Sequence, residues 1–134
     1  MDKEKHTRKK IGQNMMDRLD PRATSRLKDM IGQIAPDMVD FVIDFAYGEV
    51  MSREGLDLPT RELCIISSLV AMGCEPELKI HIRKALHIGV SEKKIVEVLL
   101  QQTVYSGFPR AINALMAAKE VFKEDKKKEN KNKS

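Results

Sequence analysis

The run at residues 63–72, LCIISSLVAM, constrains the fold more than any other stretch of this chain. Apolar residues occupy almost every position of the run, and only Ser67 and Ser68 interrupt it. A helix that is apolar on every side is usually surrounded by protein, and crossing a membrane takes about twenty apolar residues. The run is therefore predicted to be a buried helix of a folded domain and not a membrane span.

The remaining apolar residues recur at helical spacing, and no segment alternates apolar and polar residues as a strand would. Gly73 ends the apolar run and Pro76 suits the first turn of another helix, so the two are expected to form a tight hairpin. Gly89 is expected to end the second helix of this hairpin. The sequence predicts an all-α protein of six or seven helices, at about 7–18, 24–34, 36–50, 60–72, 75–88, 92–105 and 110–122, with a loop at 52–58.

Charge is concentrated at the two ends of the chain. Residues 1–10 hold five Lys and Arg against two acids, and residues 123–134 hold six Lys against three acids, although the formal net charge is only +4. The positive net charge thus comes from the two ends of the chain and does not indicate a basic binding face on the fold. With aromatic residues at 4% and no Trp, platforms for stacking on nucleic acid bases are not expected. We expect one domain over 1–122, a disordered charged tail over 123–134, and a cytoplasmic location without membrane or nucleic acid partners.

Two cysteines do not make a disulfide framework. Cys64 lies inside the apolar run and is interpreted as a small hydrophobic residue. Cys74 differs because it lies at a predicted helix N-terminus, where a thiolate is stabilised. The spacings typical of metal sites are absent, so neither a metal nor a cofactor is predicted.

Cys74, Glu77 and His81 fall on one face of the second hairpin helix because they are separated by three and four residues. Glu62 lies at the start of the preceding helix, and the hairpin geometry predicts that it meets His81. A carboxylate against an imidazole orients the ring and raises its basicity. The alternative is that Glu62 is an ordinary acid of a first helical turn and His81 an ordinary core or surface histidine.

The chain resembles the carboxymuconolactone decarboxylase family, which also contains alkylhydroperoxidase D, from about Phe45 to Phe122. The resemblance is carried in order by FAYGEVMSREGLDLPTRELCIISSLVAMG, by EPELKIHIRKALHIGVSEKKIVEVLLQQTVYSGFP and by RAINALMAAKEVF. It implies an all-helical alkylhydroperoxidase D-like bundle that assembles as a homo-trimer or homo-hexamer.

The resemblance points to two chemistries. The alkylhydroperoxidase branch uses a glutamate, a CxxC pair and a histidine, and Glu62, Cys74 and His81 stand at the matching intervals. Glu77 replaces the second cysteine, so only a peroxidase-type reaction through a lone Cys74 and an outside thiol is implied. The decarboxylase branch lacks the CxxC pair and removes carbon dioxide without a cofactor, and the segment YGEVMSREGLD resembles it more closely.

Decarboxylation is the first interpretation, with His81 as the acid–base group. The other candidate site residues are Glu62 or Glu49 as the partner of His81, Arg53 or Arg83 as an anchor for a substrate carboxylate, and Tyr105 as a hydrogen-bonding residue of a pocket. The alternatives are the Cys74-dependent peroxidase and a helical oligomer without catalytic activity.

Overall fold

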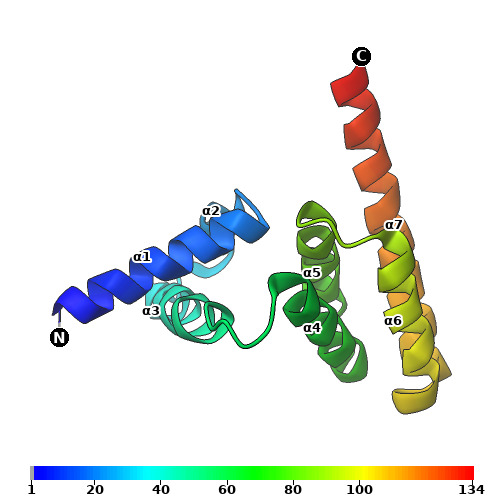
Figure 1. Ribbon diagram of the computed structural model, residues 1–134, viewed down its shortest axis with the longest axis horizontal. Coiled ribbons are helices and arrows are strands. Elements are labelled where there is room, and N and C mark those ends of the chain that lie inside the picture. The colour runs from blue at the N-terminus through cyan, green and yellow to red at the C-terminus, as the bar shows by residue number, and fades with distance from the viewer. Residues whose placement is uncertain (1) are drawn as a thin grey trace. The chain divides into compact units, whose positions relative to one another are not determined.

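The computed structural model describes residues 2–134, and over that range all of its regular secondary structure is helical (Figure 1). The elements are α1 (Asp2–Leu19), α2 (Ala23–Ile31), α3 (Pro36–Phe41), a π-helical segment η1 (Val42–Met51), α4 (Leu58–Met72), α5 (Glu75–His87), α6 (Glu92–Tyr105) and α7 (Phe108–Lys133). The predicted all-α class is confirmed. Two compact units divide the chain, of which the first ends at Leu58 and the second is Pro59–Ser134. The single domain over 1–122 stays a prediction.

The first unit is organised by close packing of α1 against η1. Gly12 of α1 lies against the backbone carbonyl of Ile43, and Gly48 of η1 lies against the backbone carbonyl of Arg8. A side chain at either glycine would collide with backbone atoms, which cannot turn aside. The two helices can therefore approach this closely only because both positions lack a Cβ atom.

A lysine–aspartate pair also joins the first unit. Lys9 Nζ lies 2.7 Å from Asp40 Oδ1. This hydrogen bond is the main cause that raises the pKa of Lys9 above its ordinary value. α1 is thus held to α3 by charge, in addition to its backbone packing against η1.

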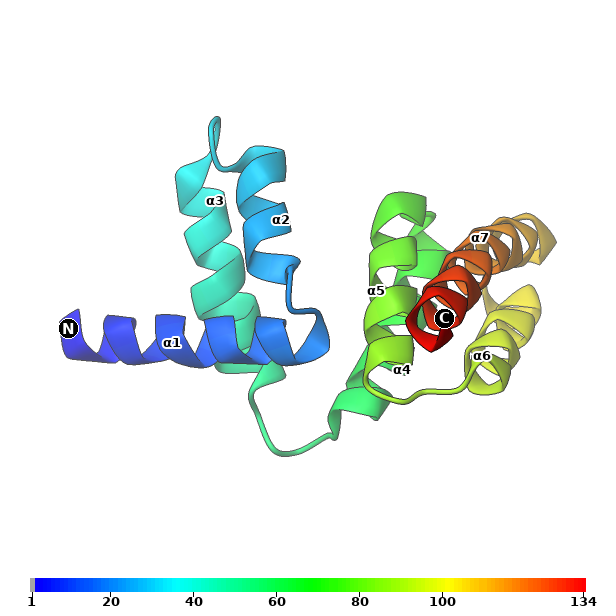
Figure 2. The ribbon, with the colours of Figure 1, turned by 90° about the horizontal axis from the view of Figure 1, so that it is seen from above.

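The second unit has its core between α4, α5, α6 and α7, and α6 and α7 run side by side in both views (Figures 1 and 2). The fully or almost fully buried core side chains are Ile66, Val70, Leu78, Ile82, Ala85, Val90, Ile95, Leu99, Ala114, Ala117, Ala118 and Val121. All four of the core residues on α7 are alanine or valine. These small side chains let α7 lie close to the neighbouring helices.

Two glycines set the limits of α5, as the sequence predicts. Gly73 N donates to Val70 O and Cys74 N donates to Leu69 O, which is the Schellman arrangement at the end of a helix. The same pair of bonds recurs around Gly89. Both glycines have positive φ, of 72° and 95°. The turns on either side of α5 therefore fix which of its residues face α4.

α4 is not buried on all sides in the described chain, which corrects one expectation. Glu62, Ile66 and Val70 are buried on one side, whereas Cys64 is exposed. The interpretation of Cys64 as a buried hydrophobic residue is therefore wrong for the single chain. An apolar run indicates that a helix packs against other protein surface. It does not show whether that surface belongs to the same chain or to another one.

The C-terminal residues are helical, which corrects the expectation of a disordered tail from residue 123. α7 continues to Lys133, and Arg83 of α5 donates two hydrogen bonds to Glu124 Oε2, at 3.1 and 2.9 Å. One turn earlier, Lys79 lies 2.6 Å from Glu120. Lys and Glu favour helix, and a partner on α5 cannot be seen in the tail sequence itself.

The Lys79–Glu120 pair is charged at neutral pH. The hydrogen bond between the two groups raises the pKa of Lys79 and lowers the pKa of Glu120 from their ordinary values. Because both ion pairs join residues 41 positions apart, α5 and α7 run parallel in a fixed register.

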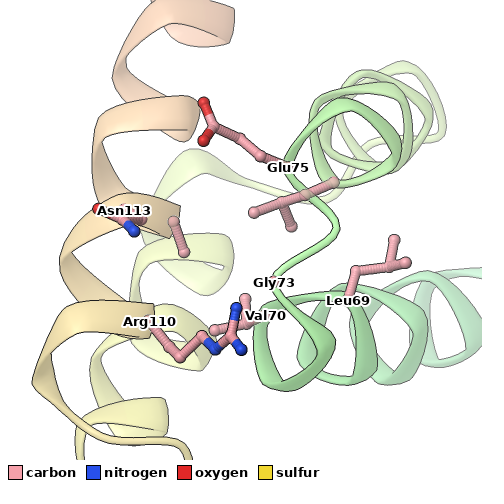
Figure 3. Close-up of a pocket in the computed structure, with 8 residues that line it drawn as sticks. Leu69, Val70, Gly73, Glu75, Arg110 and Asn113 are labelled. Atoms are coloured by element: carbon pink, nitrogen blue, oxygen red, sulfur yellow. The ribbon is translucent and has the colours of Figure 1, made fainter.

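Replacing Gly73 or Gly89 with alanine is expected to destabilise the protein by a similar amount, whereas the same change at Gly55 is not. Positive φ costs about 1–2 kcal/mol at Gly73 and at Gly89. At Gly73 the new methyl group would also meet the guanidinium of Arg110, which reaches across from α7 (Figure 3), but this is the far end of a flexible, exposed side chain that can turn aside at little cost. Gly55 has open space around it, so its alanine variant is expected to stay within about 0.5 kcal/mol.

Urea unfolding of the three variants measures this order. Similar losses are expected at Gly73 and Gly89, because the Arg110 side chain can turn aside. A larger loss at Gly73 that disappears when Arg110→Ala is combined with Gly73→Ala would show that Arg110 does not yield.

Candidate active site

The second turn of α4 and the middle of α5 bring Glu62 and His81 into contact. Glu62 Oε2 lies 2.7 Å from His81 Nδ1. The side chain of Glu62 is 0% exposed and that of His81 is 17% exposed. The predicted contact is confirmed, and it places an ionisable pair at the edge of the core, with the histidine on the side that solvent reaches.

The hydrogen bond fixes the roles of the two ring nitrogens. An ionised carboxylate only accepts hydrogen bonds, which assigns a proton to Nδ1 of His81. The other nitrogen, Nε2, is then the atom that takes up or gives up a proton. The pair can therefore serve as an oriented acid–base group without any metal ion.

The second oxygen of Glu62 is in an unusual position. Oε1 is buried and has no hydrogen-bond partner among residues 2–134. Leaving a buried acceptor unsatisfied costs about 1–3 kcal/mol. Glu62 therefore lowers the free energy of unfolding through this unpaired oxygen, and a contribution to stability alone does not explain its presence.

Cys74 lies where the sequence places it, directly before α5, as the residue that caps the helix. Its side chain is partly buried, whereas Glu77 is exposed. Both cysteines are free. Within the described part of the chain, no cluster of three or more His, Cys, Asp or Glu side chains is suited to hold a metal ion.

Two of the proposed site residues belong to the first unit. Glu49 is exposed, and its Oε2 lies 2.9 Å from Arg8 Nη1. It also lines an open groove along α1 and η1. Arg53 is exposed in the loop after η1. Their predicted roles, as a partner of His81 and as a carboxylate anchor, stay predictions.

Arg83 and Tyr105, the other two proposed site residues, lie in the second unit but do not bind the Glu62–His81 pair. Arg83 is engaged by Glu124, as described above, and therefore points toward α7. Tyr105 is 82% exposed at the end of α6. Neither makes a hydrogen bond to Glu62 or His81. Of the five nominated residues that belong to the second unit, only Glu62 and His81 are joined by a hydrogen bond.

Two buried polar residues were missed by the sequence interpretation. Gln102 is 4% exposed; it donates to Ser67 Oγ at 2.8 Å and accepts from Ser106 Oγ at 2.6 Å. This link ties α6 to α4. Lys84 is also 4% exposed and lies one turn after His81. In the sequence, Gln102 falls at helical spacing after Ile95 and Leu99, which indicates that it faces the core but not what it binds. Lys84 looks like an ordinary polar residue of an amphipathic helix.

A cavity at the other end of α4 is distinct from this pair. It is lined by Leu69, Val70, Gly73, Glu75, Leu78, Arg110, Asn113 and Ala114 (Figure 3). Its volume is only about 40 Å³, which is room for about one water molecule. It is too small for an organic substrate, so the Glu62–His81 pair remains the candidate site.

Comparisons with known proteins identify the family to which the chain is similar. The model of the carboxymuconolactone decarboxylase family matches residues 36–120. The 4-carboxymuconolactone decarboxylase of Acinetobacter baylyi is 36% identical over 106 residues, which cover 79% of each chain. The nitrosuccinic acid decarboxylase npaB of Metarhizium robertsii is 31% identical over 83 residues, covering 62% of this chain and 58% of that protein. Both of these relatives are named as decarboxylases.

Among the described helices, none is long and apolar enough to cross a membrane.

Proposed function

The chain belongs to the carboxymuconolactone decarboxylase family, and from that premise we propose that it is a carboxy-lyase that works without a cofactor. The observation that carries this proposal is the 2.7 Å hydrogen bond between Glu62 and His81. It provides an oriented imidazole beside a buried carboxylate, which is the equipment that proton transfer requires.

The proposed reaction breaks the bond between a carbon atom and its carboxylate group. Carbon dioxide leaves, the electron pair of that bond stays on the carbon, and His81 Nε2 delivers a proton to it. Without a cofactor, the substrate itself has to delocalise this electron pair. The expected substrate is therefore a lactone or related acid whose carboxylate lies next to an electron-withdrawing group.

The names of the two relatives fit this substrate class. One is named for a lactone with an additional carboxyl group, and the other for a nitro acid. Lactone and nitro groups both withdraw electrons from a neighbouring carbon. A substrate that carries a second carboxylate would also need a cation, for which Lys84, one turn after His81 on α5, is a candidate in this proposal.

The direct test offers 4-carboxymuconolactone and nitrosuccinic acid to the purified protein and follows the release of carbon dioxide. The rate is compared with that of the acid in buffer, because such acids also lose carbon dioxide slowly by themselves. Turnover of either acid would support the proposal. Rates equal to buffer for a panel of lactone and nitro acids would contradict it.

Replacing Cys74 with alanine separates the lyase from the thiol peroxidase. Because the proposed proton transfer does not involve sulfur, Cys74→Ala is expected to keep decarboxylation within about twofold. The same variant abolishes peroxide consumption if the protein is instead a peroxidase that uses the thiolate. Rapid reaction of Cys74 with hydrogen peroxide, trapped as a sulfenic acid and dependent on His81, would overturn the lyase proposal.

A homo-oligomer is also proposed, as a trimer or a hexamer. Large apolar side chains are exposed along the first turns of α7 and nearby, namely Met72, Val104, Phe108, Ile112 and Met116. Exposed apolar surface of this kind is characteristic of contacts between proteins. Native mass measurement is expected to give three or six times the mass of one chain, and a monomer at micromolar concentration would contradict it.

A further inference from the structure

A second groove lies in the second unit, between α6 and α7 and outside the Glu62–His81 pair. It is lined by Val96 of α6 and by Leu115, Ala118, Lys119, Phe122, Lys123 and Lys126 of α7. Its volume is about 390 Å³, within the range of about 300–1,000 Å³ typical of binding sites. The floor is apolar and the charged atoms belong to lysines. No step of the proposed decarboxylation uses this groove.

Two stripes along α7 make up most of the groove. Leu115, Ala118 and Phe122 are separated by three and four residues and therefore lie on one face of the helix. The lysines at 119, 123 and 126 are separated by four and three residues and form a neighbouring stripe. The result is an apolar track with positive charge along one side of it.

The acidic residues of α7 compensate this charge only in part. Glu120 and Glu124, two of the four acids of α7, are directed toward α5, where they pair with Lys79 and Arg83. Lys126 contacts Glu92 of α6 at 3.6 Å, and Lys123 also interacts electrostatically with Glu120. Within the part of the chain that the structure describes, Lys119 and Lys123 make no ion pair. The lysines that line the groove therefore keep a partly compensated positive charge.

We propose that this groove binds an acidic amphipathic helix of another protein. Residues 115–126 extend over about 16 Å of α7, a length that a partner helix of about three turns covers. A helix places apolar residues and acids on adjacent faces at spacings of three and four, which complements the two stripes. This is the helix-in-groove mode of recognition, with added charge complementarity.

The same features disfavour other occupants. A small amphiphile carries its charge at one end, whereas the lysines are distributed along the length of the groove. In a symmetric contact between two copies, the lysine stripe of one copy would face that of the other. Phe122, Lys123 and Lys126 also lie beyond the matched range 36–120, which favours a role other than the family reaction.

The test uses a synthetic, fluorescein-labelled peptide of about four helical turns, with leucines on one face and glutamates on the adjoining face. A control peptide has the same leucines with lysine in place of each glutamate. Fluorescence anisotropy with the full-length protein is expected to show saturable binding of the acidic peptide at micromolar concentration. The control peptide is expected to bind at least about tenfold more weakly.

Matched variants of the protein locate the binding. The double variant Lys119→Glu with Lys123→Glu is expected to bind the acidic peptide at least about tenfold more weakly. Lys127→Glu with Lys131→Glu changes the charge equally on the same helix, but neither position lines the groove, and binding is expected to stay within about twofold. All four positions are exposed, and circular dichroism verifies that each variant is folded.

Three results would overturn the proposal. One is equal weakening by the two double variants, which would show attraction to the basic tail in general. Another is the absence of saturable binding up to several hundred micromolar. The third is a change in native mass caused by the variant at 119 and 123, which would show that copies of this chain bury the groove.

Discussion

The alanine variant of His81 is expected to lose nearly all decarboxylase activity, with kcat lowered by about 10²–10⁴-fold. Alanine removes Nε2, the nitrogen that is left for proton transfer once Nδ1 is bound to Glu62. The measurement is the rate of carbon dioxide release at saturating substrate. The spontaneous rate is subtracted in every case.

A control for this variant is available on the same helix. His87 lies in the last turn of α5 and is exposed, so His87→Ala is expected to keep the wild-type rate. If His81→Ala also kept it, the acid–base group would have to be sought elsewhere, and the Glu62–His81 contact would be structural only.

Replacing Glu62 with methionine is expected to raise stability and lower activity together. Methionine has a similar length and no charge, so the variant removes the buried Oε1, which lacks a partner in the described chain. Removing this unsatisfied oxygen adds about 1–3 kcal/mol to the free energy of unfolding, and losing the hydrogen bond to His81 subtracts whatever part of its contribution of about 1.5–3 kcal/mol water does not restore. Nδ1 of His81 loses its acceptor, but this side chain is 17% exposed and water can take that place.

Activity is expected to fall because the imidazole is no longer held in one orientation and tautomer. The loss of a carboxylate that orients a catalytic histidine can reach about 10⁴-fold in kcat, and at least 10²-fold is expected here. Thermal unfolding and turnover are measured on the same preparation. Glu77→Met, at an exposed position of α5, is expected to change neither. A less stable Glu62→Met would mean that the hydrogen bond outweighs the cost of burial.

The Glu62–His81 contact could be predicted because it depends only on local rules. Gly73 forces the chain into a left-handed turn that glycine adopts without strain, and Pro76 starts the next helix at once. With the turn fixed, counting residues along each helix shows which positions meet. The ends of α5 were predictable for the same reason, since Gly89 repeats the turn of Gly73.

Predictions that depended on distant partners were less successful. The burial of Cys64 was inferred from an apolar run, but the described chain leaves that face of α4 open. The tail was expected to be irregular because it has no apolar residue, yet Arg83 reaches Glu124 from another helix. Nothing in the tail sequence identifies Arg83 as its partner, because an ion pair between distant residues leaves no periodic pattern.

The roles of Glu49, Arg53 and Tyr105 could not be decided in the same way. Glu49 and Tyr105 were nominated as polar residues beside apolar helices, and Arg53 as a cation for a substrate carboxylate. None was nominated by a spacing that fixes its position relative to His81. Glu49 engages Arg8 of α1, a helix that lies before the matched range. To place a residue near a site, one has to know both the helix that carries it and how that helix packs. A short sequence motif does not contain the information on packing.

The packing of α1 on η1 provides a criterion for sorting relatives of this protein. Gly48 lies inside the range that the family model matches, whereas α1 lies before it. Because the carbonyl of Arg8 occupies the space where a Cβ would stand at position 48, a relative with alanine or a larger residue there cannot seat an N-terminal helix in this way. One aligned column thus distinguishes family members that can possess such a helix from those that have to begin differently, before any of their structures is determined.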